Sequence, residues 1–329
     1  MSLIAKVFFF YITAQYNSSD VVIIIKHLKD IFMKQITFTP IEEKTLNDKL
    51  VNLYGSHLVG LYTEMERIYN DDQYPIKPAA PLLLELEQKD EDNSFPYEDA
   101  DLRVMIFGRE NNNWNDVDRR IAAKGYTNYT YNFNLQSNKD ILGEIKGEHT
   151  DEQGVELPPN EHIYGLTDIY HDYCYEKTNV TKRQFTRRMY QFIDALQKRM
   201  GTKRVGFVWN NLFKIGRGGA IFGKCCGQSP ADIKKIEKEY FDVIRKEVEI
   251  LAPHVIIFMT GTAVDNAIME KFNLPHKEFP CINDNLPHLR RVEIPGIKYA
   301  ARTIHPARKS NDILNEYNNA LIEDILKHI

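Results

Sequence analysis

Residues able to bind a polar ligand follow four separate apolar runs of this sequence. The first run is followed by a carboxylate at Glu110, the second by the amides of Asn210 and Asn211, the third by Thr260 and the fourth by His305. Together these groups accept and donate hydrogen bonds and exchange protons. If the runs are parallel strands of one sheet, their carboxyl ends meet at one edge, where ligands of open α/β sheets bind. The pattern therefore predicts one polar site assembled from four strand ends.

The elements that must position these residues alternate between strand and helix. The apolar runs are short and stop at glycine or polar residues, which is typical of buried parallel strands, and amphipathic stretches lie between them. The predicted strands are residues 102–107, 204–209, 255–259 and 299–304, and the predicted helices are residues 181–201, 231–251, 263–272 and 313–329. This order predicts an α/β fold, with a three-layer α/β/α arrangement around a central four-stranded parallel sheet.

The first hundred residues have a different character. Thr39 and Glu42 form a capping box with Pro40 at the first helical position, which predicts a helix pair running to about residue 70. A proline-rich linker follows at residues 73–81. We expect three parts: an N-terminal extension at 1–32, a helical extension and linker at 33–100, and an α/β domain at 101–329.

The composition limits the class of protein. Hydrophobic residues make up 43% and charged residues 27%, as in ordinary globular proteins, and the net charge of −4 means that any DNA contact needs a local basic patch. Four cysteines without a Cys-x-x-Cys spacing indicate a reducing compartment, so we expect a cytoplasmic protein without a metal site. The apolar run 7–12 allows a secretory signal peptide as the alternative, and is too short for the roughly 20 residues that span a membrane.

Four short motifs stand at the predicted strand ends. In chain order they are Phe107-Gly108-Arg109-Glu110, Asn211-Leu212-Phe213-Lys214, Pro253-His254-Val255-Ile256-Ile257 with Gly261, and His305-Pro306-Ala307-Arg308. Their order and spacing resemble the uracil-DNA glycosylase superfamily, especially its iron–sulfur-containing branch. The resemblance covers residues of about 100–329. It implies that superfamily's fold and hydrolysis of the N-glycosidic bond of a damaged base in DNA.

The resemblance also implies roles for single residues. Glu110 occupies the position of the residue that activates water or stabilises the positive charge that bond cleavage builds on the sugar. His305 would donate a hydrogen bond to the departing base, and Asn211 would recognise the base edge with its amide. Gly108 would line the base site and Trp114 could stack on a flipped base. The implied ligands are single- or double-stranded DNA and a nucleobase, without a cofactor.

Basic residues near two strand ends would contact phosphates beside the base, namely Arg217, Arg308 and Lys309. The sequence also departs from the superfamily's pattern. Asn111 stands where proline is usual, Ala307 replaces the usual serine, and the cluster cysteines are absent. These departures allow an altered substrate or a loss of catalysis.

Structural interpretations stand beside these functional ones. Glu110 could pair with Arg109 or Arg302. His305 could cap the fourth strand and bond a backbone carbonyl, and Asn211 could belong to a turn. The tryptophan could be packing, and the basic residues could form a solvated charged face.

Three functions are therefore open. The first is a DNA glycosylase. The second is a nucleic-acid or nucleobase-binding module of the same fold that has lost catalysis. The third is a hydrolase of a free nucleoside or nucleotide, with the long insertion at 125–201 closing the DNA groove.

Overall fold

A computed structural model describes residues 38, 40–69, 78–87, 97–110, 184–217, 231–307 and 309–329, with single residues between 163 and 175. Contacts divide the chain into two compact units, Met1–Thr39 and Pro40–Ile329. The second unit contains the central sheet and the helices around it. It also contains α3 (Leu46–Tyr69), which lies within the predicted helical extension.

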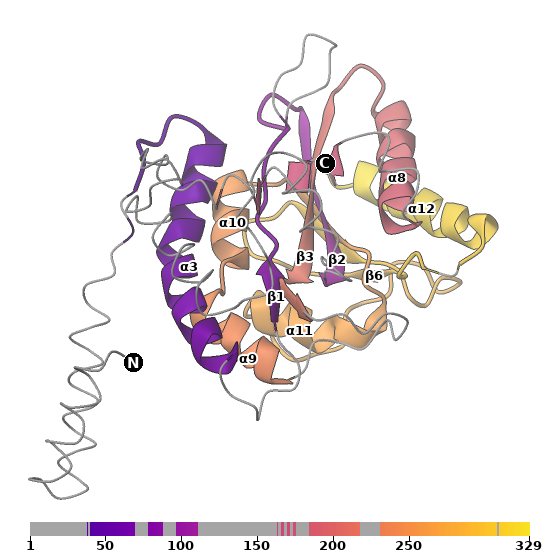
Figure 1. Ribbon diagram of the computed structural model, residues 1–329. Helices are drawn as coiled ribbons and strands as arrows, with labels where there is room; N and C mark the ends of the chain where they lie inside the picture. The colour runs from indigo at the N-terminus through magenta and orange to yellow at the C-terminus, as the bar shows by residue number, and fades with distance from the viewer. Residues whose placement is uncertain are drawn as a thin grey trace, which may run out of the picture. The chain divides into compact units, whose positions relative to one another are not determined.

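The centre of this unit is a five-stranded sheet in the order β3-β2-β5-β7-β6 (Figure 1). Its strands are β2 (Leu102–Glu110), β3 (Val205–Phe213), β5 (Val255–Phe258), β7 (Tyr299–Arg302) and β6 (Arg290–Arg291). The first four are parallel, which confirms the predicted α/β class, whereas the antiparallel β6 makes the prediction of a four-stranded sheet wrong. The short β6 carries no apolar run, so periodicity gives no signal for it.

Strand β3 is longer than the sequence predicts. It continues past Trp209 to Phe213, and its pairing with β2 runs from Leu102 opposite Val205 to Glu110 opposite Phe213. Asn211 therefore lies inside a strand, so the interpretation of this residue as part of a turn was wrong. Polar residues made the strand look finished, but the fold satisfies their hydrogen bonds internally.

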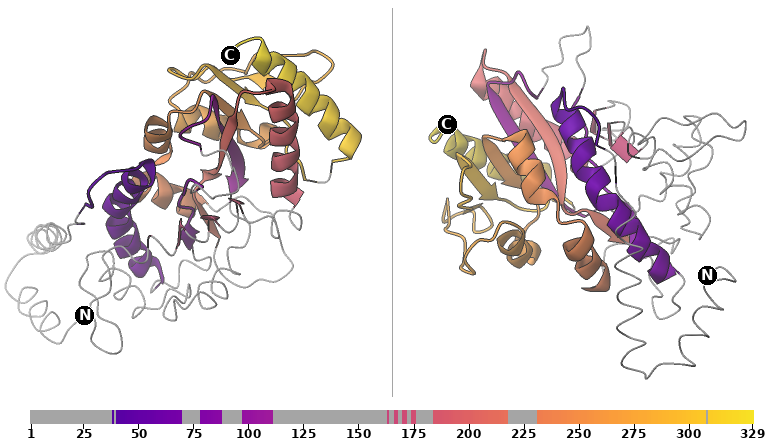
Figure 2. Two further views of the ribbon diagram at one scale, coloured as in Figure 1. Left: turned by 90° about the horizontal axis from the view of Figure 1, so that it is seen from above. Right: turned by 90° about the vertical axis from the view of Figure 1, so that its left-hand side faces the viewer.

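Helices lie on both sides of the sheet (Figures 1 and 2). On one side are α8 (Gln184–Met200) and α12 (Asn311–Leu326), and on the other are α3 (Leu46–Tyr69), α9 (Ala231–Tyr240) and α10 (Ile244–Leu251). The predicted apolar face of α8 is buried, with Met189, Phe192 and Leu196 fully covered. In the described part of the chain, no helix combines the length and apolarity that crossing a membrane requires.

The predicted helix over residues 231–251 is in fact two helices. Three residues between Tyr240 and Ile244 are not helical, and two of them, Phe241 and Val243, are completely buried. The break lets both apolar side chains enter the core, which a continuous helix would place on different faces. The remaining elements are a short helical turn and helix, η2 (Thr262–Val264) and α11 (Asp265–Lys271), and a small antiparallel sheet of β1 (Pro78–Pro81) with β4 (Ile215–Arg217).

The predicted helix pair near the N-terminus is a single helix, α3, which begins after the predicted capping box. The capping box lies at Thr45 and Asp48 instead. The Asp48 amide donates to the Thr45 hydroxyl at 3.1 Å, and the Thr45 amide donates to the Asp48 carboxylate at 2.8 Å. This reciprocal pair satisfies two amides that a helix start leaves open. The sequence signal was present, but it lay six residues further along.

Two glycines test how tightly the sheet and helices pack. A Cβ at Gly206 of β3 would lie 2.8 Å from the Ala100 side chain and from the Tyr97 backbone, whereas one at Gly60 of α3 would meet Tyr240 at an ordinary 3.5 Å. We expect Gly206→Ala to lower the free energy of unfolding by about 1–3 kcal/mol through overpacking. Gly60→Ala should raise it by about 0.5–1 kcal/mol, because alanine favours helices. Urea denaturation measures both, and equal midpoints would contradict this packing.

Candidate functional site

The centre of the sheet contains a topological switch point. Strands β2 and β5 are neighbours, and β2 is next to β3 on one side while β5 is next to β7 on the other. Ligands of open α/β sheets bind outside the carboxyl ends of strands at such a point. The carboxyl ends of these four strands carry Gly108, Asn211, Thr260 and His305.

One half of this edge is built around Gly108. It pairs with Asn211 across the sheet, and a Cβ at Gly108 would lie 2.5 Å from Asn211 Oδ1. The same position is 3.2 Å from the tip of the Phe185 ring and 3.2 Å from Trp209 Nε1. Glycine therefore gives these three side chains the space to converge.

The other half is built around Gly261, which has a φ of +64°. A Cβ there would meet Arg109 Nη2 at 3.3 Å and the His305 amide nitrogen at 3.4 Å. Arg109 is held in place because its Nε donates to the Thr260 carbonyl at 2.6 Å. Gly261 needs to be glycine both for its left-handed backbone and for this close approach.

Phe185 links the two halves. Its ring centroid lies 6.1 Å from that of His305 and 6.0 Å from that of Trp209. Gly108 and His305 therefore both lie beside one aromatic ring from α8, and Asn211 is next to Gly108. Sequence periodicity marked Phe185 only as part of the buried face of a helix, so its place at this edge was missed.

His305 is held as a neutral hydrogen-bond donor. Burial, and then the positive charge of Arg109, lower the pKa of His305 to about 4. The amide of Ala307 donates to His305 Nδ1 at 3.1 Å, so in the neutral ring the proton is on Nε2. At Nδ1 the backbone partner of His305 is therefore an amide, whereas the structural interpretation expected a carbonyl.

The space beside Asn211 is closed by side chains of the protein. Asn211 is 1% exposed, and the tip of Phe185 stands against Gly108. A cavity of about 710 Å³ lies elsewhere, beside the start of β7, and no predicted site residue lines it.

Other predicted site residues are placed less completely. Glu110 ends β2 and its backbone pairs with Phe213, but its side chain lies outside the described residues. Arg217 ends β4, again without a described side chain, and Trp114 and Arg308 lie outside the described residues. Lys309 is exposed and directly precedes Ser310, whose hydroxyl accepts from the Ile313 amide and caps α12.

The suggested pairing of Glu110 with Arg302 stays a prediction, because the side chain of Glu110 lies outside the described residues. Arg302 itself has described partners on two other segments. Its guanidinium donates twice to Asp265, at 3.0 and 2.9 Å, and once to the His288 carbonyl at 2.6 Å. Arg302 is 3% exposed, so these contacts hold α11 and the β6 region against β7.

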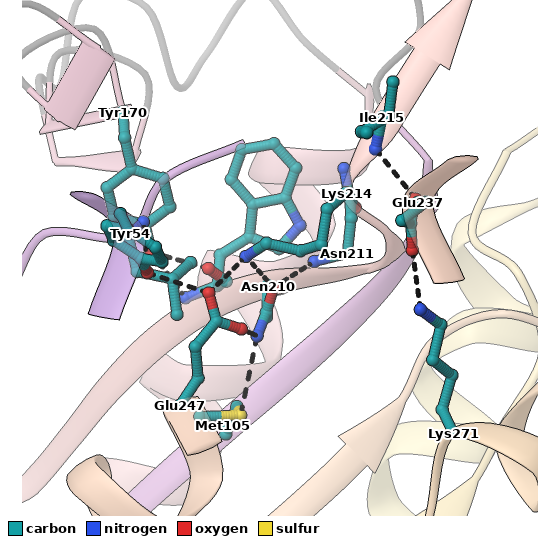
Figure 3. A network of polar contacts seen from close by, with 12 residues as sticks. Tyr54, Met105, Tyr170, Asn210, Asn211, Lys214, Ile215, Glu237, Glu247 and Lys271 are labelled. Atoms are coloured by element: carbon teal, nitrogen blue, oxygen red, sulfur yellow. Dashed lines mark hydrogen bonds and ion pairs between the residues drawn. The ribbon is translucent and has the colours of Figure 1, made fainter. Parts of the chain in front are cut away.

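A buried polar network lies at the end of β3, next to Asn211 (Figure 3). Lys214 Nζ and Glu247 Oε1 are 2.6 Å apart, and neither side chain has any exposed surface. Asn210 Oδ1 accepts from Lys214 Nζ at 2.9 Å, and Asn210 Nδ2 donates to Glu247 Oε2 at 2.8 Å. Tyr54 of α3 donates its hydroxyl proton to Glu247 at 2.8 Å. Burial lowers the pKa of Lys214, and the charge of Glu247 acts in the opposite direction.

A second ion pair, between Lys271 and Glu237, lies beside β4, the strand that follows β3. Lys271 is 2.7 Å from Glu237 and 3.2 Å from Asp242, and Glu237 accepts from the Ile215 amide at 2.9 Å. Burial raises the pKa of Glu237, and Lys271 lowers it. This pair holds β4 rather than β3. Lys214 of the first network belongs to the Asn-Leu-Phe-Lys motif, whereas no sequence pattern marks Tyr54 or Glu247.

Among the residues that the structure describes, no group of three or more histidines, cysteines, aspartates or glutamates could hold a metal ion. A scan against protein-family models finds no match, and a search of curated proteins finds none either.

The environment of His305 gives a prediction about its titration. Arg109→Met keeps the apolar stem and removes the positive charge, so we expect the pKa of His305 to rise from about 4 while remaining below 6.5, because burial persists. NMR of the imidazole nitrogens measures this shift. Arg103→Met is a matched control, since Arg103 also lies on β2 but donates to the Ala252 carbonyl at the opposite edge. An unchanged pKa in the Arg109 variant would contradict the assigned cause.

The Lys214–Glu247 pair gives a prediction about stability. Lys214→Met leaves a buried carboxylate without its cation, which should lower the free energy of unfolding by about 3–5 kcal/mol. Adding Glu247→Leu should recover part of this loss, because the unpaired charge is removed. Urea denaturation of both variants measures the difference. A double variant less stable than the single one would show that Lys214 is not paired as described.

Proposed function

We propose that this protein is a divergent relative of the uracil-DNA glycosylases that hydrolyses the N-glycosidic bond of a damaged base in DNA. One observation carries the proposal: a neutral histidine with its proton on Nε2 stands at the switch point, beside an arginine and against Phe185, whose ring tip approaches Gly108. Gly108, Asn211, Gly261 and His305, one residue from each of the four motifs, lie at the carboxyl edge of the sheet.

The chemistry of the bond supports this assignment. When an N-glycosidic bond breaks, the base departs with the bonding electrons and becomes an anion, so a fixed hydrogen-bond donor stabilises it. His305 is such a donor. Arg109 adds positive charge next to the ring, which favours an anionic leaving group further. A site for a cationic ligand would not place a guanidinium there.

Recognition of the base falls to Asn211 and Phe185. An amide offers a donor and an acceptor, which match the edge of a pyrimidine. Phe185 covers this position in the free protein, so a flipped base must displace it from Gly108. The ring centroids of Phe185 and His305 are 6.1 Å apart in the free protein, and we assign to Phe185, once displaced, the role of an apolar wall for the base.

Two features supply the remaining parts of a DNA site. Lys309 is exposed next to the capped start of α12, and both its charge and the helix dipole favour phosphate. Glu110 follows Gly108 by two residues on β2, the spacing at which residues of a strand share a face. We assign to Glu110 the stabilisation of the sugar cation or the activation of water.

The test uses the full chain and oligonucleotides that contain uracil, single- and double-stranded, with abasic sites as the readout. We expect cleavage by the wild type. Replacing His305 by glutamine, Asn211 by leucine or Glu110 by glutamine should each lower kcat/KM by about 100-fold or more.

His254→Gln is the matched control. His254 Nδ1 also accepts from a backbone amide, that of Arg103, but at the opposite edge of the sheet, so this variant should cleave like the wild type. Salt-dependent DNA binding without abasic product, with any damaged base, would replace the glycosylase by a binding module. Stabilisation by free nucleosides without DNA binding would identify a small-molecule hydrolase.

A further inference from the structure

We propose that Asn210, Lys214, Glu247 and Tyr54 are positioning residues that hold Asn211 in place for recognition of the base. This inference rests on the proposed function and extends it to residues that do not touch the ligand. It is drawn from the network at the end of β3 (Figure 3).

The first step is the contact between the network and Asn211. The backbone amide of Asn211 donates to Asn210 Oδ1 at 2.8 Å, and the same oxygen accepts from Lys214 Nζ at 2.9 Å. The other end of the Asn210 amide donates to Glu247 at 2.8 Å. With both ends of its amide engaged, Asn210 has one orientation, which fixes the backbone nitrogen of Asn211.

The second step is the way in which Glu247 is fixed. Its Oε1 atom accepts from Lys214 at 2.6 Å and from the Tyr54 hydroxyl at 2.8 Å. The Tyr54 oxygen in turn accepts from the Leu84 amide at 2.9 Å. The network therefore ties β3 to α10, to α3 and to the segment after β1, so the strand end is held from three directions.

The third step is how little the Asn211 side chain can move at the site. Asn211 Oδ1 lies in the space left by Gly108, where a Cβ would be 2.5 Å away. Little movement of Asn211 is allowed there. A displacement of about 1 Å at a positioning contact can cost on the order of 100-fold in rate, so the support beneath Asn211 matters for catalysis.

A stabilising role alone explains this network poorly. Two fully buried charges are costly to desolvate, and well-packed apolar side chains often replace such a pair without loss of stability. A network that connects four elements next to the base-recognising residue is instead suited to fixing geometry.

The experiment compares three full-length variants. Lys214→Met with Glu247→Leu removes the pair, and Tyr54→Phe removes one hydroxyl while leaving the pair intact. Lys271→Met with Glu237→Leu is the matched control, because it removes a nearby ion pair that holds Ile215 of β4 rather than Asn211.

Two readouts separate positioning from stability. The first is steady-state cleavage of uracil-containing DNA. We expect kcat to fall about 10- to 100-fold in the Lys214/Glu247 variant, and less in Tyr54→Phe, with KM unchanged. The second is the NMR signal of the Asn211 side-chain amide after labelling with ¹⁵N-asparagine. It should shift in both test variants and stay in place in the control.

Each result decides the question. Unchanged kcat and an unchanged Asn211 signal in the test variants would overturn the inference, and so would equal losses in the control. If the Lys214/Glu247 variant does not fold, Tyr54→Phe supplies the answer. If the wild type does not cleave DNA, the proposed function fails, while the Asn211 signal still decides whether the network positions that side chain.

Discussion

A lysine and a glutamate meet inside this protein, 2.6 Å apart and without exposed surface. Removing two charges from water is costly unless every remaining donor and acceptor finds a partner. Asn210 and Tyr54 provide those partners, and they come from different elements of the fold. The same few hydrogen bonds therefore fix the relative positions of β3, α10 and α3. Asn210 also contacts the backbone of Asn211, which lies at the carboxyl edge of the sheet.

The edge itself combines charge and close approach. Gly108 and Gly261 leave space where larger residues would collide with Asn211, Arg109 or His305. Among the described side chains at this edge, Arg109 carries a positive charge that helps to keep His305 neutral by lowering its pKa. A neutral donor beside a positive charge suits a ligand that gains negative charge during the reaction, as a departing nucleobase does. The motif that suggested a glycosylase and the electrostatics of the site thus support the same proposal.

Helix α3 contributes one residue to the buried network. Tyr54 lies in α3, outside the part of the sequence that resembles the glycosylases, yet its hydroxyl contacts Glu247. From the sequence we predicted this region to be an extension, because its local pattern differs from that of the α/β part. In the folded protein it completes a buried network next to the site, so the two regions depend on each other.

Local pattern was sufficient for much of the fold. The alternation of strand and helix, the four parallel strands, the buried face of α8 and the gathering of Gly108, Asn211 and His305 at one edge all followed from the sequence. Apolar periodicity is a property of neighbouring residues, and parallel strands bring their carboxyl ends to the same edge. Whether Glu110 joins them stays a prediction.

Only the tertiary structure decided which partners the buried polar residues find for their hydrogen bonds. It extended β3 through two asparagines, divided a predicted helix at Phe241, added β6 and placed Phe185 over the candidate site. Glu247 lies 33 residues from Lys214 and 193 from Tyr54. A polar residue is stable in a core when distant parts of the chain meet its hydrogen bonds, and that meeting is a property of the folded chain rather than of any local stretch.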